Sequence, residues 1–176
     1  MSGRVRVEKE GDLGWIVFDH PERRNAISVD MWRAIPDAAS ELQEDDAVRV
    51  IVMRGDGETA FVAGADISEF ERERTPDSAT GYDQQSGAAL AALMGLTKPL
   101  LAMIHGFCIG GGVTIALTAD VRYAADDARV GVPAASGWAM PAPGSSAWSA
   151  WWGRRRPRRS SSPPTASPPT RPATWG

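Results

Sequence analysis

Residues 99–112 read PLLAMIHGFCIGGG, and this stretch decides the fold class. Residues 99–104 form a short apolar run that is typical of a buried strand. Gly110, Gly111 and Gly112 follow, and residues 113–118 then favour a helix. A buried strand that passes through small residues into a helix is the repeating unit of α/β proteins.

The chain on either side of this stretch also alternates between strand and helix patterns. Residues 5–18 predict a hairpin, because alternating apolar residues are followed by two glycines and an apolar run. Ser28 is a good N-cap, and apolar residues at helical spacing predict a helix to about Glu44, which Pro36 should kink. Further predicted elements are strands at 48–53 and 121–125 and a helix at 88–94. The predicted class is therefore α/β.

Composition excludes several classes of protein. A chain of 176 residues suits one domain, and its formal net charge of −3 gives no reason to expect nucleic-acid or membrane binding. Cys108 is the only cysteine, which excludes an internal disulfide and fits a reducing compartment. The N-terminus shows no signal pattern, and no apolar run reaches the roughly 20 residues that span a bilayer. We therefore expect a cytoplasmic protein.

Two turns carry the chemistry. The first turn, residues 63–66, reads AGAD and the second turn is the glycine triplet 110–112. Side chains this small leave backbone amides exposed, and the first amides of a helix lack internal partners and favour negative charge. Amides from two such turns, converging on one oxygen, would form an oxyanion hole for a thioester enolate.

Four motifs in order resemble the enoyl-CoA hydratase/isomerase (crotonase) family. They are the loop HPERRNAIS at 20–28, the segment AFVAGADI at 60–67, the stretch 99–112, and GVP at 131–133. The resemblance covers about residues 5–135. It implies a spiral of ββα repeats that binds acyl-CoA thioesters, with no separate cofactor because coenzyme A is part of the substrate, and assembly into homotrimers or hexamers.

The resemblance also implies roles for individual residues. The amides of Ala65 and Gly111 would form the oxyanion hole, and no metal is expected. The coenzyme A moiety would lie along a second set, in which Arg24 would meet a phosphate. That set comprises Arg24, Ala26, Ala63, Asp66 and Ile67, next to Ala65 and Gly111.

The chain departs from the family at the acids that act on water. Hydratases of the family carry one Glu two residues after the glycine triplet and another just after the Gly-x-Pro segment. Thr114 and Ala134 occupy these positions, and neither can act as a general acid or base as Glu would. The acid/base residues of this chain are therefore unknown.

Several of these features also have purely structural interpretations. The glycine triplet would serve equally as a close packing point, and Asp66 as a helix N-cap. Cys108 lies in an apolar run and is better interpreted as a small core residue than as a nucleophile. His20 and His105 accompany no cluster of metal ligands, and the charged residues 69–74 suit a solvated helix face or loop.

The composition changes abruptly near residue 136. Residues 137–176 contain no Leu, Ile, Val, Phe, Tyr, Asp, Glu or Lys, but hold eight of the 13 prolines and five of the seven tryptophans. We interpret residues 1–135 as an incomplete acyl-CoA-binding core and 136–176 as a low-complexity, disordered tail. Our hypothesis is that the tail arises from a reading-frame error in GC-rich DNA.

Three functions compete at this stage. The first is an acyl-CoA enzyme of the hydratase/isomerase type in damaged or truncated form. The second is a non-catalytic acyl-CoA-binding protein or inactive fragment, because the Glu pair is absent. The third is an interaction protein whose Arg/Trp/Pro tail binds nucleic acid or a protein partner. Turnover of a short enoyl-CoA would separate the first two, and salt-dependent DNA binding would favour the third.

Overall fold

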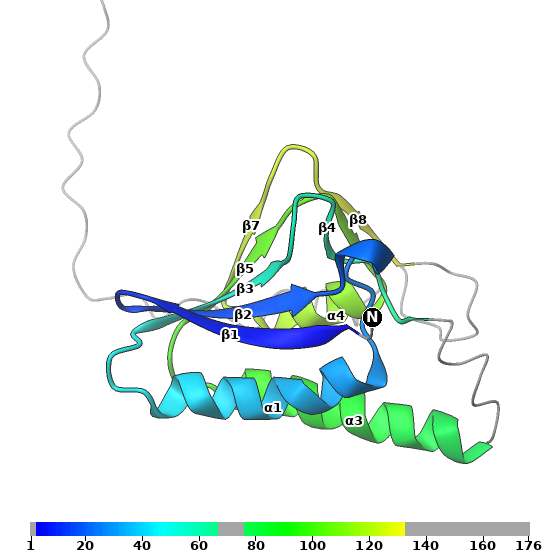
Figure 1. The fold of residues 1–176 in the computed structure, drawn as a ribbon, viewed down its shortest axis with the longest axis horizontal. Helices are drawn as coiled ribbons and strands as arrows, with labels where there is room; N and C mark the ends of the chain where they lie inside the picture. Colours follow the sequence, from blue (N-terminus) through cyan, green and yellow to red (C-terminus); the bar gives the residue numbers. More distant parts are fainter. Residues whose placement is uncertain (1–2, 67–75, 133–176) are drawn as a thin grey trace, which may run out of the picture. The chain divides into compact units, whose positions relative to one another are not determined.

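The computed structural model describes residues 3–66 and 76–132, and of residues 76–81 it describes the backbone alone (Figure 1). The predicted tail, the boundary at 135 and the charged residues 69–74 lie outside this description. None of the helices in the described ranges is long and apolar enough to cross a membrane.

A five-stranded sheet forms the larger layer, in the order β1-β2-β3-β5-β7. The predicted hairpin is confirmed, since β1 and β2 pair antiparallel with Val7 opposite Ile16. The remaining neighbours pair parallel. The strands are β1 (Arg4–Glu10), β2 (Leu13–Asp19), β3 (Val50–Gly55), β5 (Leu100–Ile104) and β7 (Val121–Ala124).

A second sheet of three parallel strands carries the candidate site, in the order β4-β6-β8. It consists of β4 (Ala60–Val62), β6 (Phe107–Ile109) and β8 (Arg129–Gly131). The sequence predicts no strand at residues 60–62 or 107–109, and the structure has one at each place. Each strand has three residues and is stabilised by its neighbours in space, so neither shows a periodicity long enough to recognise in the sequence.

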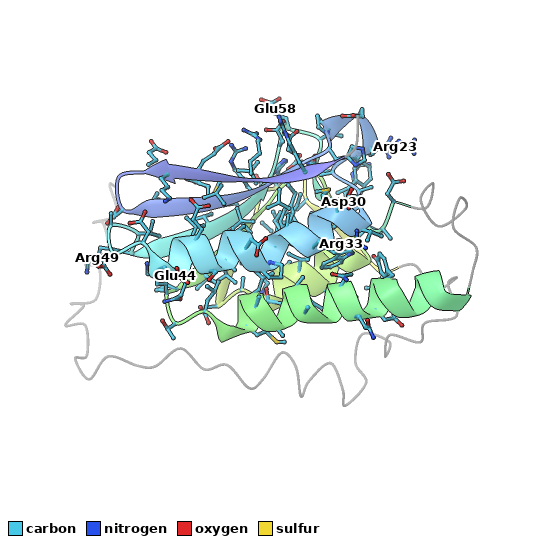
Figure 2. All side chains as sticks on the ribbon, turned by 60° about the horizontal axis from the view of Figure 1, so that its bottom comes forward. Arg23, Asp30, Arg33, Glu44, Arg49 and Glu58 are labelled. Atoms are coloured by element: carbon cyan, nitrogen blue, oxygen red, sulfur yellow. The ribbon has the colours of Figure 1, made fainter. Side chains whose placement is uncertain are left out.

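Two helices, α1 (Val29–Glu44) and α3 (Pro76–Gly95), lie side by side, as both Figure 1 and Figure 2 show. The N-cap prediction is confirmed, because the Ser28 hydroxyl accepts a hydrogen bond from the amide of Met31. The helix α1 continues through Pro36, and the expected kink stays a prediction. Its polar residues Asp30, Arg33 and Glu44 are exposed to solvent (Figure 2).

The helix α3 is longer than the predicted 88–94. Its first half begins with a proline and consists mostly of polar residues with one glycine, which mask helical periodicity in the sequence. Packing against α1 supplies the stabilisation that intrinsic propensity does not. The helix α4 (Gly111–Thr118) begins within the glycine triplet, two residues before the predicted start.

Candidate functional site

The two turns lie at the same edge of the second sheet. In the parallel pair β4 and β6, Val62 lies opposite Cys108, so the carboxyl ends of both strands meet at one edge. The first turn follows β4 and the second turn follows β6. The first turn lies close to the residue before the second turn, because a Cβ added to Gly64 would be 3.4 Å from the carbonyl oxygen of Ile109.

The first turn is bound to the loop 20–28 by three backbone hydrogen bonds. Ala63 N–H donates to the Arg24 carbonyl over 3.1 Å, Ile27 N–H donates to the Gly64 carbonyl over 2.7 Å, and Asp66 N–H donates to the Ile27 carbonyl over 3.0 Å. This is a parallel bridge between Ile27 and Ala65. In such a bridge the amide of Ala65 itself points away from Ile27, so these contacts leave it unused.

Asn25 holds the loop 20–28 in place. It is 1% exposed and has a left-handed backbone with φ 55°. Its side-chain oxygen accepts a hydrogen bond from His20 N–H over 3.0 Å, and its amide nitrogen donates to the carbonyls of Asp56 and Ala60 over 2.9 and 2.8 Å. Asn tolerates positive φ better than most residues, and here it also pairs three backbone groups, two of them buried.

The second turn depends on having no side chains. Gly110 has φ 53° and donates its N–H to the Gly131 carbonyl over 3.0 Å. A Cβ on Gly112 would lie 2.2 Å from the carbonyl oxygen of Val62, so only glycine fits against β4. Gly111 is the first residue of α4, and its amide therefore has no acceptor within the helix.

Two arginines lie over Phe107 at the end of the site. The guanidinium carbon of Arg24 is 4.9 Å from the ring centroid and that of Arg129 is 5.4 Å away. Both side chains are exposed, so two cations share one aromatic ring in a geometry that also leaves them available to an anion. Arg129 could not be predicted as a site residue, since nothing in the sequence indicates that β8 lies beside β6.

The other expected binding residues lie along the same strip. Ala26 is buried, and its carbonyl oxygen is 3.0 Å from Nδ1 of His20. Ala63 is half-buried, and its N–H donates to the Arg24 carbonyl. Asp66 is buried, with Arg23 Nη1 3.7 Å from its carboxylate. Ile67 lies outside the described residues.

The two positions expected to carry acids differ in what the structure describes. Thr114 is half-buried on the first turn of α4, with its hydroxyl 3.4 Å from the Gly110 carbonyl oxygen. Ala134 lies outside the described residues. In residues 3–66 and 76–132 no group of three or more His, Cys, Asp or Glu is placed to hold a metal ion.

Cys108 and the His20 side chain are buried, and so is one ring nitrogen of His105. Cys108 is fully buried on β6, and desolvation raises the pKa of its thiol to about 12, so it is not a thiolate at neutral pH. The His20 ring meets the Ala26 carbonyl, as described above. Nε2 of His105 is buried without a hydrogen-bond partner in the part of the chain that the structure describes.

Ile27 and Trp32 were not expected at the site. A Cβ on Gly111 would meet Cζ2 of Trp32 at 3.5 Å and Cγ2 of Ile27 at 3.7 Å, which are ordinary van der Waals distances. The space beside the Gly111 amide is therefore walled by these two side chains. Ile27 was noted only as part of the loop motif 20–28, and Trp32 was not singled out in the sequence.

Comparisons with known proteins agree with the arrangement. The chain is 34% identical to the short-chain-enoyl-CoA hydratase of Clostridium acetobutylicum over 129 residues, which cover 73% of this chain and 49% of that protein. It is 33% identical to the hydroxycinnamoyl-CoA hydratase-lyase of Pseudomonas fluorescens over 147 residues, covering 80% and 51%. The chain thus spans about half the length of these relatives.

A solved structure of an enoyl-CoA hydratase/isomerase family protein from Hyphomonas neptunium superposes with a TM-score of 0.70 at 45% identity, over 73% of this chain and 49% of the other. The fold is the α/β crotonase fold that the motifs predict. The family model described as enoyl-CoA hydratase/isomerase matches residues 8–159, which extends past residue 135, where the recognised motifs end. The chain belongs to the enoyl-CoA hydratase/isomerase family.

Proposed function

We propose that the protein binds acyl-CoA thioesters and polarises the thioester carbonyl with the backbone amides of Ala65 and Gly111. The observation that carries the proposal is the meeting of two side-chain-poor turns at the carboxyl edge of β4 and β6. The Ala65 amide points away from its bridge partner, and the Gly111 amide opens a helix. Two such donors stabilise an oxygen that gains negative charge as the thioester becomes an enolate.

The coenzyme A moiety would then follow the loop 20–28. Arg24 and Arg129 supply two exposed positive charges over Phe107, and a phosphate of the nucleotide would lie against them. Ala26, Ala63, Asp66 and Ile67 would line the pantetheine, because small residues let an extended ligand approach the backbone. Loss of Arg24 should therefore weaken binding of a CoA ester more than binding of the matching pantetheine ester, which lacks the nucleotide.

The test compares two ligands that differ in one oxygen. Butyryl-CoA has the thioester carbonyl, while S-butyl-CoA, a thioether, has a methylene group in its place. We expect butyryl-CoA to bind at least about tenfold more tightly, since two hydrogen bonds of about 1 kcal/mol each would be lost with the thioether. Equal affinities measured by isothermal titration calorimetry would sink the oxyanion-hole assignment, and absence of binding by both would sink the function.

A second candidate function, acyl-CoA binding without turnover, is favoured by Thr114. A threonine whose hydroxyl lies 3.4 Å from a carbonyl oxygen of its own helix is no substitute for a carboxylate that activates water. Hydration of crotonyl-CoA, followed through loss of its ultraviolet absorbance, distinguishes the two. Turnover above the rate in buffer would require an acid/base residue other than Thr114. Tight binding without such turnover would support the binding role.

A further inference from the structure

Trp32 has a buried hydrogen-bond donor that nothing in the described structure uses. The residue is 2% exposed, and its indole Nε1–H has no partner among the described residues. A buried donor left unpaired costs free energy, and buried Trp N–H groups usually find an acceptor. The fold therefore retains an unfavourable feature that a Leu or Phe at this position would not have.

The unused donor lies beside the proposed oxyanion hole. Cζ2 of Trp32 is the nearest atom to the position that a Cβ on Gly111 would take, 3.5 Å away. In an indole ring Cζ2 and Nε1 are both bonded to Cε2, so they lie on one edge of the ring. The edge that carries the N–H thus borders the space next to the Gly111 amide.

That space would accommodate a small group. A Cβ on Gly111 makes only ordinary contacts with Trp32 and Ile27, whereas a Cβ on the adjacent Gly112 would lie 2.2 Å from a backbone oxygen. There is therefore room for a carbon atom beside Gly111, whereas there is none beside Gly112. An acyl group whose carbonyl rests on the Gly111 amide would extend into this room.

The indole is also held in orientation. Its ring packs edge to face against Tyr82 of α3, with centroids 6.2 Å apart and planes at 89°. Trp32 is thus fixed between α1, which carries it, and α3 and α4, which flank it. A donor held in this way forms a hydrogen bond with little further loss of side-chain entropy.

We propose that Trp32 determines acyl specificity. Its N–H would donate a hydrogen bond to an acyl oxygen a few bonds from the thioester carbonyl, so that short acyl groups with such an oxygen bind in preference to plain alkyl groups. The proposal rests on the proposed function and deepens it. The acyl oxygen would supply the acceptor that the described residues do not provide. A site with a buried donor rejects ligands without the matching acceptor, because they leave the donor unpaired.

The test measures the ratio of two dissociation constants, for butyryl-CoA and for 3-hydroxybutyryl-CoA, each enantiomer being titrated separately. With the 176-residue chain we expect one enantiomer of the hydroxy ester to bind about tenfold more tightly, the size of one good hydrogen bond. Trp32→Phe keeps an aromatic ring and removes the N–H, so the ratio should fall to about one. Trp15→Phe, the same change on β2, is the control and should retain the ratio.

A second measurement does not depend on how well the variant folds. The indole N–H resonance of Trp32, assigned through bonds in ¹⁵N,¹³C-labelled protein, should move downfield on saturation with the hydroxy ester and not with butyryl-CoA. An unmoved resonance, or a wild-type ratio near one while butyryl-CoA binds, would overturn the specificity role and leave the proposed function standing. Failure of butyryl-CoA itself to bind would remove both.

Discussion

The first turn and the second turn carry the two amides of the proposed oxyanion hole, but they are held in place by opposite means. Residues 63–66 are held by hydrogen bonds to the loop 20–28. Asn25 anchors this loop through a hydrogen bond to the carbonyl of Ala60, which lies 35 residues further along the chain. Residues 110–112 are held by close packing, since Gly112 lies against the Val62 carbonyl with no room for a methyl group. The first turn is therefore vulnerable to the loss of one polar side chain, and the second turn to the gain of one carbon atom.

The largest effect is expected from Gly112→Ala, which attacks the packing of the second turn. The new Cβ would lie 2.2 Å from the Val62 backbone oxygen, so β4 or α4 must move. We expect a loss of about 3 kcal/mol in the free energy of unfolding, at the upper end of overpacking costs. Urea unfolding followed by far-UV circular dichroism measures it. A loss below about 0.5 kcal/mol would show that the contact relaxes freely and that close packing of Gly112 against Val62 does not hold the second turn.

Asn25→Gly attacks the hydrogen bonds that anchor the first turn. Glycine keeps the positive φ accessible, so the change removes the side chain's three bonds without adding backbone strain. We expect a loss of about 2 kcal/mol, because the buried backbone groups of His20 and Ala60 and the part-buried carbonyl of Asp56 lose their partner. Asn25→Ala should lose about 1 kcal/mol more through φ alone. Equal stabilities for the two variants would show that the backbone at residue 25 relaxes.

Gly111→Ala sharpens the comparison within the second turn. Its Cβ meets only side chains at ordinary distances, so the free energy of unfolding should stay within about 1 kcal/mol of wild type. The methyl group fills the space beside the amide, and we expect affinity for butyryl-CoA to fall about tenfold, or about 1.4 kcal/mol. Gly87→Ala is the matched control on α3, where a Cβ meets nothing within 4 Å. Equal affinities for the two variants would place the acyl group elsewhere.

The smallest effect is expected from Ser28→Ala, at the point where the first turn meets α1. The Ser28 hydroxyl accepts from Met31 N–H over 3.2 Å, and its loss should cost about 1 kcal/mol of unfolding free energy. Because Ile27 bridges to Ala65, fraying of α1 should reach the first turn. Hydrogen exchange at Asp66, whose amide is bonded to the Ile27 carbonyl, would report this coupling. Unchanged exchange at Asp66 would show that α1 and the first turn are independent.

Elements whose pattern is long and local could be predicted from the sequence. The β1–β2 hairpin and α1 follow from alternation and from an N-cap with regular apolar spacing, and both were found close to their predicted ends. The strands β4 and β6 were missed because three residues carry no period and each strand depends on the other. The start of α3 was missed because its packing against α1 outweighs the weak helix propensity of its Gly and polar residues.

The family, the two small-residue turns and the absence of Glu at position 114 follow from the order of the residues alone. Only the tertiary structure decided that Arg129 joins Arg24 over Phe107, and that Trp32 lies beside Gly111 with an unpaired N–H. The reason is physical. Residue type and spacing determine local conformation, whereas proximity between β6, β8, α1 and α4 arises from parallel pairing and burial across long separations in the chain.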